Sequence, residues 1–210
     1  MMGIGAKLHC IVALLAVGTV GCATLNKDDC VNADWRTIGY QDGALGKVAE
    51  VIGNYREDCA EHGVKPDLNA YLAGREQGLR EYCREANGFR IGHSGKIYHG
   101  VCPGDLEYAF KVGYRDGREI YELAADIRNT ERDLQKKTRS LDTLDEELSL
   151  AEAELISDGV GSERRAELLL RTRELAIDIG TLQNDVRRME SDLSVKRDKL
   201  QALRDSSPYL

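Results

Sequence analysis

The sequence predicts a mainly α-helical protein: a small disulfide-stabilised helical domain with a short β-hairpin, followed by a long antiparallel coiled-coil hairpin. Two observations lead to this prediction. Residues 30–118 hold most of the glycine, tyrosine and cysteine, whereas residues 119–205 contain no cysteine. In the second segment, apolar residues recur every seven positions on both sides of a helix-breaking cluster at 157–162, which is typical of two helices joined by a turn.

The N-terminal segment, residues 1–21, has the pattern of a secretory signal peptide. Lys7 supplies the positive charge, and residues 11–17 form an apolar run that is too short to span a bilayer. The tetrapeptide that ends at Cys22 is similar to a bacterial lipobox, although Thr19 stands where leucine is usual. The resemblance implies a lipoprotein that carries its lipid, palmitate included, on Cys22. An ordinary cleaved signal peptide is the alternative.

Residues 22–29 are predicted to be the lipidated cysteine and a linker that keeps the next domain close to the bilayer. Ala23 follows Cys22, whereas an aspartate there would signal inner-membrane retention in a typical enterobacterial system. We therefore expect a bacterial cell-envelope protein on the periplasmic face of the outer membrane. Removing Lys7 with the signal peptide takes the formal net charge from −7 to −8, which argues against nucleic acid as a partner.

Six cysteines occur in the chain, of which Cys10 would be removed with the signal peptide and Cys22 would carry the lipid. The four that remain are Cys30, Cys59, Cys83 and Cys102. An even number in an oxidising compartment predicts two disulfides, for which three connectivities exist. We favour Cys30–Cys59 and Cys83–Cys102 because these pairs close the shorter loops. Each bridge would stabilise the small domain by about 2–4 kcal/mol.

Pairs of glycines four positions apart occur in three segments of the domain, at 39–43, 74–78 and 113–117. Each pair follows an aromatic residue by three or four positions. On a helix, such glycines share one face and let another backbone approach closely. We expect tight packing of short helices at these segments. A glycine-lined groove for a ligand is the functional alternative.

Helix boundaries in the domain follow from capping residues and breakers. Asp34 is expected to cap a first helix that ends near Gly46. A second helix is expected over residues 48–62, before Gly63, and a third from Leu68 to about Ala86.

The stretch after Asn87-Gly88 is expected to be non-helical. Two short β-prone runs, 89–91 and 96–98, flank His93-Ser94-Gly95 and predict a β-hairpin. Pro103-Gly104-Asp105 then opens a long helix.

The same half carries an extended combination of motifs. It begins with Cys30…Asp34-Trp35…Gly39-Tyr40-x-Asp42-Gly43-x-x-Gly46, continues through Cys59 and Tyr71-x-x-Gly74-Arg75-x-x-Gly78-Leu79-x-x-Tyr82-Cys83, and ends with Gly92-x-x-Gly95-x-x-Tyr98-x-Gly100-Val101-Cys102-Pro103. Over residues 22–122 this combination resembles a family of bacterial lipoproteins classed only as a domain of unknown function. The resemblance implies an exported envelope protein. It implies no activity.

Two mirrored pairs have the spacing of metal ligands, Cys59-x-x-His62 and His99-x-x-Cys102. Two thiolates and two imidazoles would suit tetrahedral zinc. Disulfide formation would remove both thiolates, and an oxidising periplasm favours disulfides. We therefore expect no metal and no cofactor in the mature chain.

Catalytic candidates are less well defined. Asp42, Glu76 and Asp116 would have to act as general acids or bases, but each lies in a polar segment and is expected to face water or cap a helix. Ser94 lies beside His93, but no oxyanion motif accompanies them. We predict no catalytic residue.

The second half begins its heptad pattern at Ile120. Its core positions include Ile120, Ile127, Leu134, Leu141, Leu148 and Leu155 before the break, and Leu168, Leu175, Ile179, Leu182, Leu193 and Leu200 after it. Facing Leu148 with Leu175 sets one antiparallel register, in which Leu155 also faces Leu168. Each helix would be about 60 Å long at 1.5 Å per residue.

This register predicts the contacts at the rim of the hairpin. The attractive pairs are Glu147–Arg171, Glu119–Lys199 and Glu131–Arg197, and the repulsive pairs are Asp126–Asp192 and Asp133–Asp185. Lys137 and Lys196 occupy core positions, and we expect their ammonium groups to extend into water.

The function predicted from these features is a structural or protein-interaction role in the cell envelope. The membrane would be reached through lipid on Cys22, and a protein partner or a second copy through the coiled coil. One alternative is an enzyme that modifies cell wall or lipid with the Cys/Gly-rich domain. Another is a module that binds a metal or a small ligand through histidine and cysteine.

Overall fold

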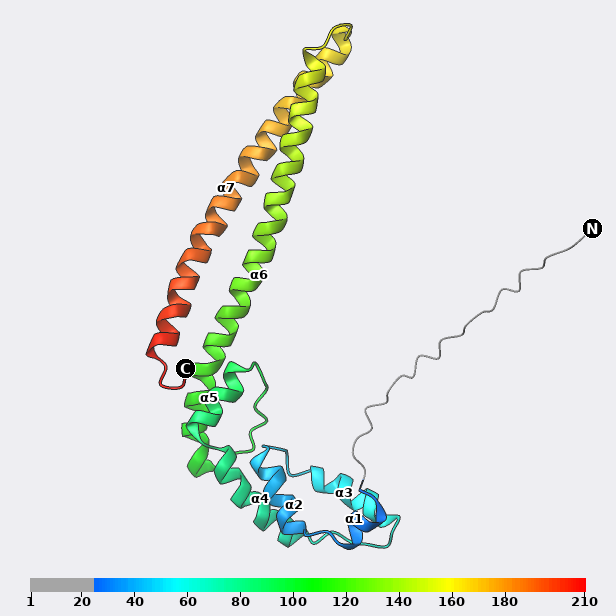
Figure 1. The fold of residues 1–210 in the computed structure, drawn as a ribbon, viewed down its shortest axis with the longest axis vertical. Coiled ribbons are helices and arrows are strands. Elements are labelled where there is room, and N and C mark those ends of the chain that lie inside the picture. The colour runs from blue at the N-terminus through cyan, green and yellow to red at the C-terminus, as the bar shows by residue number, and fades with distance from the viewer. Residues whose placement is uncertain (1–24) are drawn as a thin grey trace, which may run out of the picture.

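The computed structural model describes residues 25–210, so the predicted signal peptide and the lipidation site Cys22 lie outside the described residues. Seven α-helices and no strand occur in this part of the chain. The helices are α1 (Lys27–Val31), α2 (Trp35–Ala44), α3 (Val51–Ala60), α4 (Leu68–Tyr82), α5 (Glu85–His93), α6 (Gly104–Leu155) and α7 (Ser162–Ser206). Figure 1 shows the short helices gathered at one end of an elongated molecule, from which α6 and α7 extend side by side.

Two of the short helices, α2 and α4, begin where the sequence predicts, but α4 ends at Tyr82 and not near Ala86. Asp34 is the N-cap of α2, and its carboxylate accepts hydrogen bonds from two backbone amides of the first turn. Asp67 accepts one such bond and begins α4. Gly46 and Gly63 both adopt the left-handed conformation, with φ of +70°, beyond the ends of α2 and α3.

The predicted β-hairpin is wrong, because residues 85–93 form α5 instead. Phe89 and Ile91 are buried side chains of this helix. Gly88 and Gly92 lie on the face that meets α6, where a Cβ on either would overlap the α6 backbone. A short apolar run between glycines suits a strand or a buried helix equally well, and here packing against α6 decides for the helix.

The short helices form two similar helix pairs, because α2 packs against α4 and α5 packs against α6. We call residues 25–82 unit 1 and residues 83–121 unit 2. In each unit, a Gly-x-x-x-Gly segment of one helix lies directly against the same kind of segment in the other helix. The facing segments are 39–43 with 74–78 in unit 1 and 88–92 with 113–117 in unit 2. The three segments seen in the sequence are therefore part of a set of four.

The two units share finer details as well. After its first helix, each has a left-handed glycine stacked against a tyrosine ring: Gly46 against Tyr82, and Gly95 against Tyr121. In both units a side chain of the second helix donates a hydrogen bond to the carbonyl of the residue after this glycine, at 2.8 Å in unit 1 and 3.0 Å in unit 2. The domain is thus an internal duplication of one glycine-packed helix pair.

Helix α6 joins unit 2 to the arm, which we define as residues 119–206. It has 52 residues and is therefore about 78 Å long. At the base of the arm, Phe89 of α5 is buried in one cluster with Ile120 of α6 and Leu200 of α7. Tyr209 packs against Phe89, with a distance of 5.0 Å between the ring centroids. Among residues 25–210, no helix combines the length and the apolar character needed to cross a membrane.

Candidate functional site

The four cysteines of the domain form two disulfides, Cys30–Cys59 and Cys83–Cys102. This is the connectivity with the shorter loops, and it places one bridge in each unit. All four side chains are buried, the most exposed being Cys102 at 8%. In unit 1 the bridge joins α1 to α3, and in unit 2 it joins the residue after α4 to the segment before α6. Each disulfide therefore fixes the segments that flank a glycine-packed helix pair.

The proposed zinc ligands are not brought together by this fold. Cys59 and Cys102 are in different disulfides and lie in different buried clusters, so neither offers a thiolate. Within residues 25–210, no group of three or more His, Cys, Asp or Glu side chains is arranged to hold a metal ion. The alternative of a metal site at Cys59, His62, His99 and Cys102 is therefore not supported, because both of its sulfur ligands are in disulfides.

Unit 1 contains a buried polar cluster centred on Asp42. This side chain was expected to face water or cap a helix, but the residue is only 3% exposed. Its carboxylate accepts hydrogen bonds from Tyr55 and Tyr71, each at 3.0 Å to Oδ2, and forms an ion pair with Lys47 at 2.8 Å. Tyr71 is part of the motif described from the sequence, whereas Tyr55 and Lys47 carry no sequence signal that links them to Asp42.

Burial and the carboxylate change the titration of these donors. Burial raises the pKa of Tyr71 above its usual value, and the negative charge of Asp42 raises it further. Tyr55 has a raised pKa for the same reasons, burial first. The hydrogen bond to Asp42 raises the pKa of Lys47. Because the carboxylate already has three donors, the cluster satisfies a buried charge and stabilises unit 1.

The corresponding positions of unit 2 are apolar. Ile91 precedes the second glycine of its segment, as Asp42 does in unit 1, and Phe110 stands where unit 1 has Tyr71. Phe110 is fully buried and stacks on Tyr82 with 5.3 Å between ring centroids. The polar cluster is therefore not required by the shared helix-pair architecture.

The remaining catalytic candidates are far from such an environment. Glu76 and Asp116 have side chains that are 69% and 55% exposed. The hydroxyl of Ser94 donates a hydrogen bond to the carbonyl of Ile91 at 2.9 Å, and the ring of His93 stacks on Phe89. Ser94 and His93 thus have separate local roles at the end of α5.

The arm packs in the register that the heptads predict. Seam residues of both helices are buried, among them Ile120, Ile127, Leu168, Leu175, Ile179, Leu193 and Leu200. All three predicted attractive pairs occur as ion pairs: Glu147–Arg171 at 2.7 Å, Glu131–Arg197 at 2.6 Å and Glu119–Lys199 at 2.9 Å. Two separate stretches of heptads therefore specify one antiparallel arrangement.

The lysines in the seam reach the partly exposed rim, where their ammonium groups also form ion pairs with carboxylates. Lys137 forms an ion pair with Asp185 at 2.8 Å. Lys196 lies between Asp126 and Asp192, at 2.9 and 2.6 Å. The carboxylates that were predicted to repel one another are therefore neutralised by cations from the seam. This hydrogen bonding lowers the pKa of Asp185 and raises that of Lys196.

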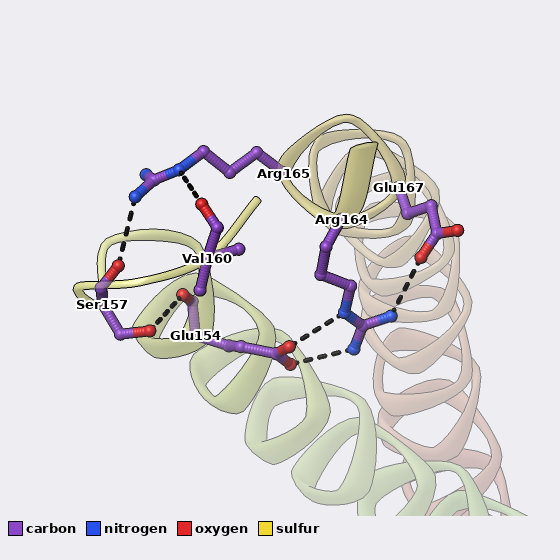
Figure 2. A network of polar contacts seen from close by, with 6 residues as sticks. All are labelled: Glu154, Ser157, Val160, Arg164, Arg165 and Glu167. Atoms are coloured by element: carbon purple, nitrogen blue, oxygen red, sulfur yellow. Dashed lines mark hydrogen bonds and ion pairs between the residues drawn. The ribbon is translucent and has the colours of Figure 1, made fainter. Parts of the chain in front are cut away.

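The tip of the arm is held by two adjacent arginines (Figure 2). The guanidinium of Arg165 donates hydrogen bonds to the carbonyls of Leu155, Ser157 and Val160, at 2.7, 3.1 and 3.1 Å. These carbonyls end α6 and form the turn, where intrahelical partners are missing. Arg165 therefore fixes the shape of the turn between the two long helices.

Arg164 joins the two helices directly. Its Nε and Nη2 donate to both carboxylate oxygens of Glu154, at 2.8 and 2.9 Å, and Nη1 reaches Glu167 at 3.2 Å. The same hydrogen bond lowers the pKa of Glu154. The roles of Arg164 and Arg165 were not predicted from the sequence. Both are cations in the first turn of α7, a position that the helix dipole disfavours, and this placement indicates that they have partners elsewhere.

Comparison with protein families bears on the two units. Residues 34–119 match the family model described as "Protein of unknown function (DUF2799)". The match begins at the N-cap of α2 and ends within α6, so it spans both glycine-packed helix pairs. The arm beyond residue 119 lies outside it. Comparisons with curated proteins and with solved structures gave no match.

Proposed function

We propose that this protein is a periplasm-facing outer-membrane lipoprotein, tethered through Cys22, whose arm is an antiparallel coiled coil that docks on another protein of the envelope. The continuity of α6 carries the proposal. One helix runs from the disulfide-bonded unit 2 to the tip, so the domain and the arm share a rigid element. A rigid helix of this length is suited to contacting a partner at a distance from the domain.

The ends of the molecule support this role. Helices α1 and α3 lie at the end of the molecule opposite to the tip (Figure 1). A lipid on Cys22 would thus tether one end while the arm extends away from it. At the base, the cluster of Phe89, Ile120 and Leu200 fixes the direction in which the arm leaves the domain.

The distal half of the arm also carries apolar side chains that its own seam does not use. Leu168, Leu169 and Leu170 are consecutive, but only Leu168 is buried, whereas Leu169 and Leu170 are 57% and 65% exposed. Ile156 at the tip is 81% exposed and Ile177 is 59% exposed. Exposed apolar residues on a helix whose core face is already covered favour a protein partner.

Site-specific photo-cross-linking in intact envelopes tests this function. A photoreactive amino acid would replace Ile156 or Leu170 at the distal arm, and Tyr108, which is 80% exposed on α6 in unit 2, as a control. We expect both arm positions to give one adduct with another protein and the control to lack it. Absence of a protein adduct along the arm, or an adduct with a second copy alone, would contradict the proposed docking.

A further inference from the structure

An apolar cavity of about 360 Å³ lies between α3 and the segment that leads into α4. Ile52 and Gly53 line it from α3, and Pro66 and Leu68 from the opposite side. Its wall is mainly apolar, yet Leu68 is 51% exposed, so apolar surface remains open to the outside. A volume in this range suits a ligand or part of one. The duplication does not account for this cavity, because α3 has no helical counterpart in unit 2.

The cavity lies on the helix that receives the start of the described chain. The backbone amide of Leu25 donates a hydrogen bond to Asp58 on α3 at 3.1 Å. Leu25 and Ile52 pack against the same buried cluster, which includes Cys59. Cys22 precedes Leu25 by three residues, which span about 11 Å at most. A lipid tether on Cys22 therefore keeps α3, which lines the cavity, within reach of the membrane surface.

Charge at the cavity favours an anionic group. Arg56 and Lys65 both line it, and both are exposed. Among residues 25–210, neither has a carboxylate within ion-pair distance, unlike the lysines of the arm. Glu50 also lines the cavity, which leaves one net positive charge there. The chain as a whole is acidic, so this is a local site and not a broad basic surface.

We propose that this cavity takes one acyl chain of an anionic phospholipid from the membrane, with Arg56 and Lys65 at the headgroup phosphate. The inference rests on the proposed function, because the tether on Cys22 brings the cavity to the bilayer. It adds a second, non-covalent attachment that would orient unit 1, and hence the arm, relative to the membrane. A covalent lipid together with a bound phospholipid gives more stable membrane binding than either attachment alone.

Gly53 provides a variant that fills the cavity without disturbing the fold. A Cβ at Gly53 would meet nothing within 4 Å, and leucine favours a helix over glycine. Gly53→Leu should therefore fold and place a side chain where the acyl chain would lie. Gly180→Leu is the matched control, because Gly180 is also helical with nothing within 4 Å but lies far along α7.

The experiment uses the lipidated chain in phosphatidylcholine vesicles that contain a small fraction of phosphatidylglycerol with a photoreactive acyl chain. A parallel set carries the photoreactive chain on phosphatidylcholine. We expect adducts within residues 50–68, a yield about tenfold lower for Gly53→Leu, and no change for Gly180→Leu. The phosphatidylglycerol probe should react more than the phosphatidylcholine probe, and the double variant Arg56→Gln/Lys65→Gln should remove this difference.

Several results would overturn the inference. Adducts elsewhere, or an equal yield from Gly53→Leu, would show that the cavity does not hold the probe. Equal reaction with both lipids would refute the anionic headgroup. A photoreactive fatty acid on Cys22 that labels residues 50–68 of its own chain, where the phospholipid probe does not, would assign the cavity to the tether. Intact mass of the same samples reports lipid on Cys22, so failure of the tether is distinguished from failure of the cavity.

Discussion

Lys196 on α7 forms an ion pair with Asp126 on α6 at 2.9 Å, at a heptad position where an apolar side chain is usual. The same ammonium reaches Asp192 at 2.6 Å and hydrogen-bonds to Thr130 at 3.4 Å. A polar residue at a seam position weakens the seam but fixes register and the number of helices. The arm therefore contains a feature that favours one hairpin over larger assemblies.

Replacing Lys137 and Lys196 with leucine should preserve or raise the stability of the arm and reduce its specificity. We expect the melting temperature to stay the same or rise, because apolar residues often replace partly buried ion pairs without loss of stability. We also expect self-association, because the longer apolar seam accepts further helices. Thermal unfolding and sedimentation velocity measure the two effects. A lower melting temperature with unchanged sedimentation would contradict this view of the lysines.

Gly78→Ala should destabilise unit 1 strongly. A Cβ at Gly78 would overlap the backbone carbonyl of Tyr40 and force α2 away from α4. We expect a loss of about 1–3 kcal/mol or more in the free energy of unfolding. Gly180→Ala has open space around it and should instead gain up to about 1 kcal/mol, because alanine favours a helix. Urea unfolding compares the two variants, and equal effects would show that close glycine packing is not required.

Tyr71→Phe should destabilise unit 1 by removing a donor to the buried carboxylate of Asp42. The lost hydrogen bond joins a charged acceptor, so we expect a cost of about 1.5–3 kcal/mol. Tyr108→Phe provides the control, since Tyr108 is 80% exposed. Chemical unfolding at neutral pH measures both. No difference between the two variants would mean that Asp42 does not depend on this donor.

Stability should also fall at alkaline pH. Burial raises the pKa of Tyr71 and Tyr55 above the usual value of 10.0. A raised pKa in the folded state gives a contribution that is complete below the unfolded pKa and is lost as pH rises through the folded value. The free energy of unfolding should therefore decline above about pH 10, with a smaller slope in Tyr71→Phe. Urea unfolding across this pH range gives the slope of the free energy of unfolding against pH. Identical slopes for wild type and Tyr71→Phe would show that Tyr71 is not responsible for the decline.

The features predicted well from the sequence are those that repeat locally. The heptads on either side of residues 157–162 each define a face, and one register satisfies both. That register placed Glu147 beside Arg171 before any geometry was known, and the pair occurs at 2.7 Å. Capping by Asp34 was also predicted, because the backbone amides that it caps lie within one turn.

The features that were missed depend on partners distant in the chain. Phe89 and Ile91 were predicted as part of a strand because residues that bury them, Leu200 for Phe89 and Phe110 for Ile91, lie far along the chain. Asp42 read as solvent-facing because one of its donors, Tyr71, belongs to another helix. Heptad periodicity placed Lys137 and Lys196 in the seam, but it does not predict where a lysine ammonium group points. The ion pairs of these lysines were therefore not predicted.

The proposed function depends on a lipid on Cys22 that tethers the chain to the outer membrane. Metabolic labelling with radioactive palmitate, followed by envelope fractionation, tests it with wild type and Cys22→Ala in parallel. The account predicts label on the wild-type chain in the outer-membrane fraction and none on the variant. Equal labelling of Cys22→Ala, or a wild-type chain recovered free in the cytosol, would contradict it.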